Sequence, residues 1–284
     1  MRDIMQSYAF PEAMLVCTHV LVDRLLVRDW PNGFPWQDAA PEWLGNERHL
    51  LPAVLRLDQL DDTQHEEIAR CLAVETASAI LIRSDLSADA LARRLARHVT
   101  VTLADDSAAV LRFADPRVFI HLLWVLPLPH LASLCDGASG WWVPHHDLWH
   151  ELQFRDRPEA VWSRLDEAQS IALTNVGLVN DTLATLPAVP DLKQLWRCSQ
   201  EINQWLCVAQ SEFGLACASD CVAFARHGCL LGEGFTGHPR LAPYLHEAAT
   251  NPGLYAEASA LLDESDWDNV IDDIEQTNRK REVS

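Results

Sequence analysis

Three histidines lie close together in the sequence, at His145, His146 and His150. His146 and His150 are four positions apart, so a helix would place both imidazoles on one face, which is a spacing that metal sites use. The glutamate of the metalloprotease motif His-Glu-x-x-His is missing, because Asp147 follows His146. The three histidines could equally form a polar and aromatic surface with the tryptophans beside them. A metal-dependent hydrolase that uses these histidines is therefore one functional hypothesis.

A glycine-rich segment, Gly232 to Gly237, satisfies the pattern G-x-G-x-x-G of dinucleotide-binding loops. In that motif the glycines follow a strand and hold a pyrophosphate at a helix N-terminus. Here the preceding residues have a helical pattern, and Glu233 would repel the phosphates. The segment is therefore predicted to be a turn between two helices.

Two arginines and an aspartate interrupt the apolar run "VLRFADPRVFIHLL", Val110 to Leu123. Since unpaired buried charges destabilise a protein, these groups either prepare a reactive site or lock a strand to a helix. Asp115 has the chemistry of a helix N-cap, and Pro116 suits the first helical position. Arg117 would oppose the helix dipole unless it pairs with a carboxylate or reaches a partner, and Arg112 is placed to meet a carboxylate, such as Asp115. The pattern predicts a strand-to-helix corner held by capping and ion pairing.

The segments around these motifs alternate between strand-like and helix-like patterns in the first half of the chain. Thr63 and Glu66 fit a capping box at the start of one helix, and Ser87 can cap another. The first half therefore predicts an α/β fold, with a mixed sheet of about four or five strands and flanking helices. The predicted strands are Ala13–Val20, Ala53–Leu57, Ser78–Ile82, Val99–Leu103 and Ala109–Phe113.

The second half of the chain has a helical pattern from about Asp156 onward. Apolar residues recur at helical spacing from Leu192 to Ala209, and a further stripe contains Cys221 and Phe224. The sequence thus predicts two domains, an α/β domain over residues 1–150 and an all-α domain over residues 151–284.

The chain is strongly acidic, with a formal net charge of −19 over 284 residues. This charge repels phosphate backbones and anionic membranes, so we expect neither nucleic acid nor a membrane as a partner, and a neutral or basic protein fits better. An uncharged run from Val118 to Cys135 approaches the length of a membrane span, but Pro127 and Pro129 interrupt it. No secretory signal is recognisable at the N-terminus, and the eight cysteines lack the spacing of a secreted disulfide scaffold. We therefore expect buried thiols and a cytoplasmic protein.

The segment from Leu55 to Val125 resembles the adaptor domain of type VI secretion effector chaperones, which is catalogued as a domain of unknown function. The matching stretches are "SAILIRS", "LARRLARHVTV" and the hallmark "VLRFADPRV", which fits the family's Arg-Phe/Tyr-x-Asp-Pro-Arg core. The second half is weakly similar to the helical extension of such proteins, through "EAQSIAL" and "GEGFTGHP". The Trp- and Pro-rich stretch from Trp30 to Trp43 departs from the family, in which a more regular helical segment is expected.

The resemblance implies a cytoplasmic, non-enzymatic adaptor that binds one toxic effector, usually at the effector's N-terminal region, and loads it onto the valine–glycine-repeat spike protein (VgrG). Such a protein needs no catalytic residue, metal or cofactor. Residues 1–150 would then be the adaptor domain, and the hallmark residues Arg112, Asp115, Pro116 and Arg117 would be structural. Exposed apolar side chains would anchor the effector. The predicted anchors are Trp141, Trp142 and Trp149.

Overall fold

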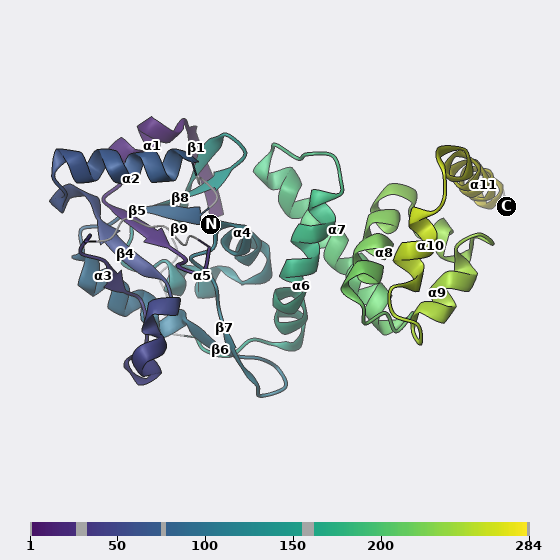
Figure 1. Cartoon of the computed structure of the whole chain (residues 1–284), viewed down its shortest axis with the longest axis horizontal. Coiled ribbons are helices and arrows are strands. Elements are labelled where there is room, and N and C mark those ends of the chain that lie inside the picture. The colour runs from purple at the N-terminus through teal and green to yellow at the C-terminus, as the bar shows by residue number, and fades with distance from the viewer. Residues whose placement is uncertain (1, 27–32, 75–77, 155–161, 283–284) are drawn as a thin grey trace. The chain divides into compact units, whose positions relative to one another are not determined.

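The computed structural model describes residues 2–26, 33–74, 78–154 and 162–282 (Figure 1). The chain divides into two compact units, residues 1–173 and 174–284, and the division falls within helix α6 (Glu167–Ala184). The sequence pattern had placed a boundary between residues 150 and 151. Strand β9 (Leu148–Phe154) runs across that position and is hydrogen-bonded on both sides, so residues 151–154 are part of the sheet.

The first unit is built on a seven-stranded sheet, in the order β1-β9-β8-β5-β2-β4-β3. Each strand is antiparallel to its neighbours. The α/β fold class is confirmed, and the sheet has more strands than the four or five expected. The strands besides β9 are β1 (Arg2–Tyr8), β2 (His19–Val22), β3 (Gln37–Asp38), β4 (Ala53–Arg56), β5 (Ala79–Arg83) and β8 (Gly140–His145).

Helices α1 (Phe10–Val16) and α2 (Asp62–Val74) pack on one face of the sheet. Met14 of α1 and Leu72 of α2 share a buried cluster with Val20 of β2. The predicted strand Ala13–Val20 is wrong, because its first part is α1 and β2 begins at His19. A short apolar run has no periodicity that separates a buried strand from a buried helix.

The opposite face of the sheet is also covered. Helix α4 (Pro116–Val125) places the ring of Phe119 on the indole of Trp141 in β8, with the ring centroids 5.1 Å apart and the planes 8° from parallel. Central strand residues that point toward this face, such as Leu21 and Ile80, are fully buried. The middle portions of β2, β4 and β5 are therefore apolar on both faces, as expected for strands enclosed between two layers. The further helices of this unit are α3 (Ala88–Leu95), α5 (Leu128–Leu134), η1 (Glu42–Leu50), η2 (Leu57–Gln59) and η4 (Ala96–His98).

A second, two-stranded sheet pairs β6 (Thr100–Thr102) with β7 (Ala108–Val110). Both strands are shorter than predicted and form a sheet separate from the large one. The outer edge of β6 is covered by residues 163–165, since the Thr102 amide donates to the Ser163 carbonyl and the Leu165 amide donates to the Thr102 carbonyl. Because β7 ends at Val110, Arg112 lies in the connection to α4 instead of on the predicted strand.

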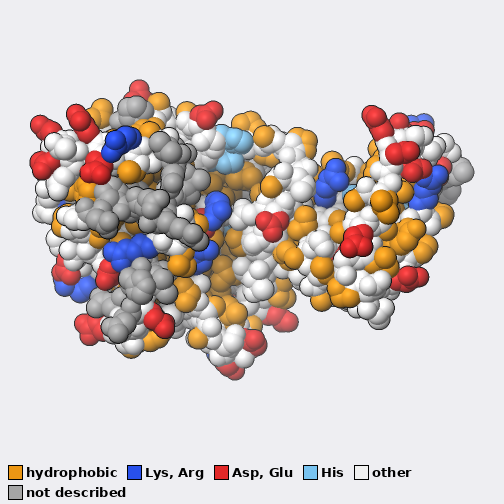
Figure 2. Space-filling model, in the orientation of Figure 1, with side chains coloured by type: hydrophobic (Ala, Val, Ile, Leu, Met, Phe, Trp, Pro, Cys, Tyr) orange, Lys and Arg blue, Asp and Glu red, His pale blue; other side chains and the backbone are white. Residues whose placement is uncertain are grey.

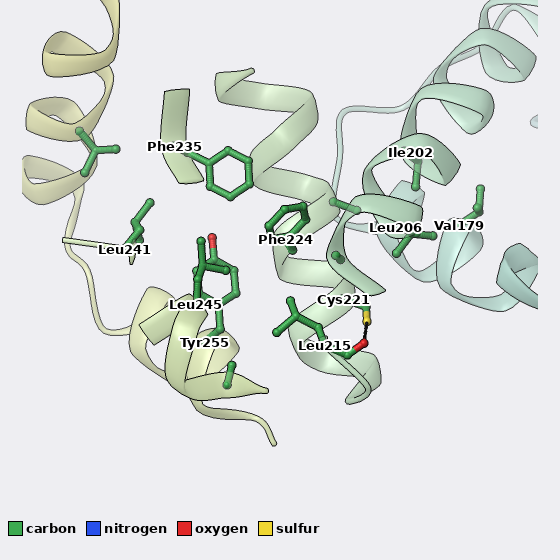
Figure 3. Close-up of a cluster of buried hydrophobic side chains, with 14 of the residues drawn as sticks. Val179, Ile202, Leu206, Leu215, Cys221, Phe224, Phe235, Leu241, Leu245 and Tyr255 are labelled. Carbon is green, nitrogen blue, oxygen red and sulfur yellow. Dashed lines mark hydrogen bonds between the residues drawn. The ribbon is translucent and has the colours of Figure 1, made fainter. Parts of the chain in front are cut away.

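The second unit is helical, as the sequence predicted. Its core is a cluster around Phe224 of α8 (Ala218–Leu231), and the centroid of the Phe224 ring lies 4.9 Å from that of Phe235 and 5.1 Å from that of Phe213 (Figure 3). Ile202 and Leu206, from the predicted apolar repeat, are fully buried in it. The elements are α7 (Leu192–Ser211), α8 (Ala218–Leu231), η5 (Glu233–Gly237), α9 (Ala242–Ala248), α10 (Leu254–Ala260) and α11 (Glu264–Glu282), together with the end of α6.

The glycine-rich segment Gly232 to Gly237 has a packing role. Gly232 ends α8 with a φ of 69°, a conformation that favours glycine. A Cβ atom on Gly234 would come within 2.7 Å of the Ile274 Cγ2 atom of α11, so a larger residue would displace the Ile274 side chain. Phe235 is fully buried in the core. The segment therefore packs against α11, and it connects two helices, as predicted.

Helix α11 carries much of the acidic charge of the second unit, and Figure 2 shows the red side chains gathered over it. Two pairs attach it to the segment that follows η5, Arg240 with Asp266 and His238 with Asp273. Among the residues that the structure describes, no helix combines the length and apolar character needed to cross a membrane.

Candidate functional site

The hallmark residues build the corner between β7 and α4. The Asp115 carboxylate is 2% exposed and accepts a hydrogen bond of 2.9 Å from the Arg117 amide at the start of the helix, which confirms the predicted N-cap. Pro116 is the first helical residue, where its missing N–H leaves no hydrogen bond unmade. The Arg117 side chain folds back on the same carboxylate, with Nε and Nη2 at 3.1 and 3.0 Å from its two oxygens.

Arg112 bridges two buried carboxylates. Its Nε donates to the Asp23 Oδ2 atom at 2.9 Å, and its Nη2 lies 2.9 Å from the same oxygen and 3.4 Å from Asp115 Oδ2. Asp23 is as buried as Asp115, and its other oxygen accepts the Leu25 amide at 2.9 Å. The expected partner, Asp115, is thus the more distant one, and sequence reasoning missed Asp23. The available signal was a lone aspartate directly after the buried strand β2.

Two arginines and two aspartates therefore form a hallmark cluster, consisting of Asp23, Arg112, Asp115 and Arg117. Hydrogen bonding to Asp115 raises the pKa of the Arg117 guanidinium. The carboxylates are buried, whereas the Arg112 and Arg117 side chains are 37% and 55% exposed. Formal charge cancels within the cluster. Each carboxylate accepts from at least one charged donor and one backbone donor, so its buried oxygens are satisfied without water.

The three predicted tryptophan anchors are buried, so the expectation that they are exposed is wrong. Trp141 and Trp149 are 1% exposed and Trp142 is 0% exposed. Neighbouring residues of a strand point to opposite faces, and both faces are covered here. Trp141 stacks on α4, whereas Trp142 and Trp149 lie in the cluster beneath α1 and α2. These side chains are core residues of the sheet.

A second polar cluster lies beside Trp142. The Glu151 carboxylate of β9 is buried and accepts hydrogen bonds from the Tyr8 hydroxyl at 2.9 Å and from Nε2 of the Gln153 side chain at 2.9 Å. Arg83 reaches the same carboxylate at 3.4 Å, and its guanidinium carbon lies 5.1 Å from the centroid of the Trp142 ring. The hydrogen bond to Glu151 raises the pKa of Tyr8. These contacts tie β1, β5 and β9 together across the sheet.

The helix that would place His146 and His150 on one face does not form, because a hairpin occupies this position. His145 ends β8, His146 lies in the turn with a φ of 52°, and His150 is in β9. The hairpin still gathers the rings, with centroids 4.4 Å apart for His145 and His146 and 6.0 Å apart for His145 and His150. Within the described ranges, no group of three or more His, Cys, Asp or Glu side chains is arranged to hold a metal ion.

None of the eight cysteines, all of which the structure describes, takes part in a disulfide. Burial raises the pKa of Cys135 well above its usual value, and burial also raises the pKa of Cys221 to about 11. Cys217, at the start of α8, differs, because hydrogen bonds from Ser219 and from backbone amides lower its pKa. The expectation of buried thiols is thus correct for Cys17, Cys135 and Cys221, whereas the other five cysteines are partly exposed.

The first unit is an α/β unit in which the hallmark cluster holds the connection between β7 and α4. A helical unit follows it in the sequence. Residues 35–133 match the model of a family described as "Domain of unknown function (DUF4123)", about a third of the chain and including the whole hallmark motif. This family is known in the context of type VI secretion effector chaperones. No curated protein and no solved structure matches the chain.

Proposed function

We propose that this protein is a non-catalytic, cytoplasmic adaptor that binds a type VI secretion effector, at the effector's N-terminal region, and loads it onto the VgrG spike. The family match over residues 35–133 supports the association with effector delivery. The proposal that the protein is non-catalytic rests on the hallmark cluster, in which the charged arginine and aspartate side chains pair with one another.

A reactive site presents titratable groups to a cleft, where they can meet a substrate. In the hallmark cluster both carboxylates are instead buried, and Asp115 is held by the helix N-terminus and by Arg117. A group in this position holds the chain between β7 and α4 in one conformation. Such rigidity suits a platform for recognition, because a preorganised surface loses less conformational entropy when it binds.

The charge of the chain agrees with a protein partner. A net charge of −19 disfavours nucleic acid and anionic membranes as partners, and it helps to keep a binding surface soluble before the effector arrives.

Co-expression with the effector encoded beside this protein tests the proposal. We expect a stable complex that survives size-exclusion chromatography and an increase in the soluble fraction of the effector. A second pull-down with the VgrG spike should recover the spike only when the effector is present. An effector from an unrelated secretion cluster is the control and should not bind. An effector that remains unbound and equally soluble would contradict the proposal.

The alternative function, a metal-dependent hydrolase, is tested with the same purified protein. The rings of His145, His146 and His150 do lie near one another at the hairpin. Stoichiometric zinc that disappears in a His145→Ala variant would favour the hydrolase, whereas a substoichiometric metal content unchanged by that substitution favours the adaptor.

A further inference from the structure

A single tryptophan stands out on the surface of the first unit. Trp43 is 71% exposed, and it is the one tryptophan among the exposed large apolar residues that the structure describes. Its indole lies in η1 (Glu42–Leu50), within the stretch matched by the family model. Tryptophan is strongly enriched among the residues that dominate binding energy at protein interfaces. The exposed indole of Trp43 is therefore a candidate contact residue for a protein partner.

The backbone holds this tryptophan in a defined place. The segment between β3 and β4 is closed at its base, where the Ala39 amide donates to the Pro52 carbonyl at 2.8 Å. Ala39 and Leu51 are buried at this base, and the Leu44 amide donates to the Pro41 carbonyl beside Trp43. In Figure 1 the segment is the dark-blue coil that protrudes below α3. A side chain presented from a closed loop loses little further conformational entropy on binding.

Two acidic residues belong to the same loop as Trp43, and Glu42 directly precedes it in the sequence. Among the loop side chains that the structure describes, the charged ones are Glu42 and Glu47, and both are exposed. The sequence of the loop also contains Arg48, so the charge of the loop itself is small, but the chain as a whole carries −19. A cation over the face of an indole is favoured by the ring quadrupole, and nearby carboxylates add to that attraction. An apolar partner would gain only from the indole, whereas a Lys or Arg side chain gains from the indole and from the carboxylates.

We infer that residues 39–52 form a docking loop in which Trp43 receives a lysine- or arginine-bearing segment of the effector, with Glu42 and Glu47 pairing with its charge. This inference rests on the proposed adaptor function and assigns it a surface. It replaces the buried tryptophans of β8 and β9 as anchors.

The experiment measures binding of the co-expressed effector by isothermal titration calorimetry, at two salt concentrations. Trp43→Ala should weaken binding at least tenfold, and Trp43→Leu should weaken it more than Trp43→Phe, because leucine has no π-face. Glu42→Gln combined with Glu47→Gln should weaken binding several-fold at low salt and reduce its dependence on salt. The matched control is Leu15→Ala, which truncates an 83% exposed side chain on α1 and should leave the affinity unchanged.

Thermal melts of each variant establish that the fold is intact, as expected for side chains that point into water. If the parent protein binds the effector and Trp43→Ala binds it equally well, the docking loop is refuted while the adaptor function stands. If the parent protein binds no effector, the adaptor function fails and this inference fails with it. If Trp43→Ala changes only self-association of the chain, the loop contacts a second copy and the inference is overturned.

Discussion

Arg112 and Asp23 are joined by a hydrogen bond of 2.9 Å between Nε and Oδ2, although 89 positions separate them in the sequence. The contact links the end of β2, in the centre of the large sheet, to the residues that start α4. Asp115 completes the link, since the Arg112 Nη2 atom that contacts Asp23 also lies 3.4 Å from Asp115 Oδ2. A motif that looks local in the sequence thus depends on a carboxylate supplied from far away.

Arg112→Ala should lower the free energy of unfolding by about 2–4 kcal/mol, because it leaves the buried Asp23 carboxylate without its charged partner. Asp115→Ala should lower it by about 2–3 kcal/mol, through loss of the helix cap and of the pair with Arg117. Urea unfolding followed by circular dichroism measures both. The control is Arg93→Ala, which removes an exposed pair with Asp89 and should change stability by less than about 1 kcal/mol. Equal midpoints for all three variants would refute the structural role of the hallmark.

Truncation of the buried tryptophans should reduce stability. Trp141→Ala leaves a large cavity under Phe119 and should lower the free energy of unfolding by about 3–5 kcal/mol. Trp141→Phe should be much milder, because the indole N–H has no hydrogen-bond partner among the described residues and the aromatic stack is partly kept. Differential scanning calorimetry distinguishes the two. A Trp141→Ala variant with the parent's melting temperature would contradict the burial.

Two helix glycines should respond oppositely to the same substitution. Gly177 in α6 is exposed, and no atom lies within 4 Å of the place that an added Cβ would take, so Gly177→Ala should stabilise the second unit by about 0.5–1 kcal/mol. Gly228 in α8 lies directly against the Trp205 ring, so Gly228→Ala forces that ring to move and should destabilise the unit by about 1–3 kcal/mol. Chemical denaturation measures the free energy of unfolding of both variants. A change of the same sign in both would contradict the close contact between Gly228 and the Trp205 ring.

The second unit should lose stability in mild acid. His227 is buried between Tyr255, whose hydroxyl lies 2.6 Å from its Nδ1, and the ring of Trp267. Burial, helped by Arg226, lowers the pKa of His227 to about 4. The unfolded chain binds a proton near pH 6.5 and the folded unit does not, so stability falls as the pH drops from about 6.5 toward 4, by about 3 kcal/mol in total.

Unfolding free energies measured between pH 7 and pH 4 for the parent and for His227→Gln test this dependence. The variant is expected to be less stable at neutral pH but to have a shallower slope with pH, since one of the buried histidines is gone. His19, with a similarly lowered pKa of about 4, remains in both proteins and cancels in the comparison. Identical slopes would contradict the role of His227.

Local patterns predicted those parts of the fold in which sequence neighbours determine the outcome. Asp115 caps α4 and Pro116 is its first residue, as expected, and Ser87 caps α3. The capping box of α2 lies two positions earlier than predicted, since Asp61 and Gln64 exchange the side-chain-to-amide hydrogen bonds. Competing polar residues at the start of a helix make this kind of shift hard to foresee.

Features that depend on tertiary contacts escaped sequence reasoning. Strand β8 is apolar on both faces, and in β9 the adjacent polar residues His150 and Glu151 interrupt the apolar ones, so neither segment shows the alternation that identifies a strand. The same enclosure buries the tryptophans that were expected on the surface. Asp23 became part of the hallmark cluster only through folding, because a pair separated by 89 positions leaves no local pattern.

Because both units contain buried cysteines, the reactivity of these thiols reports which unit has unfolded. Cys17 and Cys135 are buried in the first unit, and Cys221 is buried in the second. Pulsed alkylation followed by mass spectrometry would therefore register the melting of each unit separately, without any introduced dye. Cys217, whose thiolate is favoured by its hydrogen bonds, should be modified first in the native protein. Its rate of alkylation therefore serves as an internal reference for the other thiols.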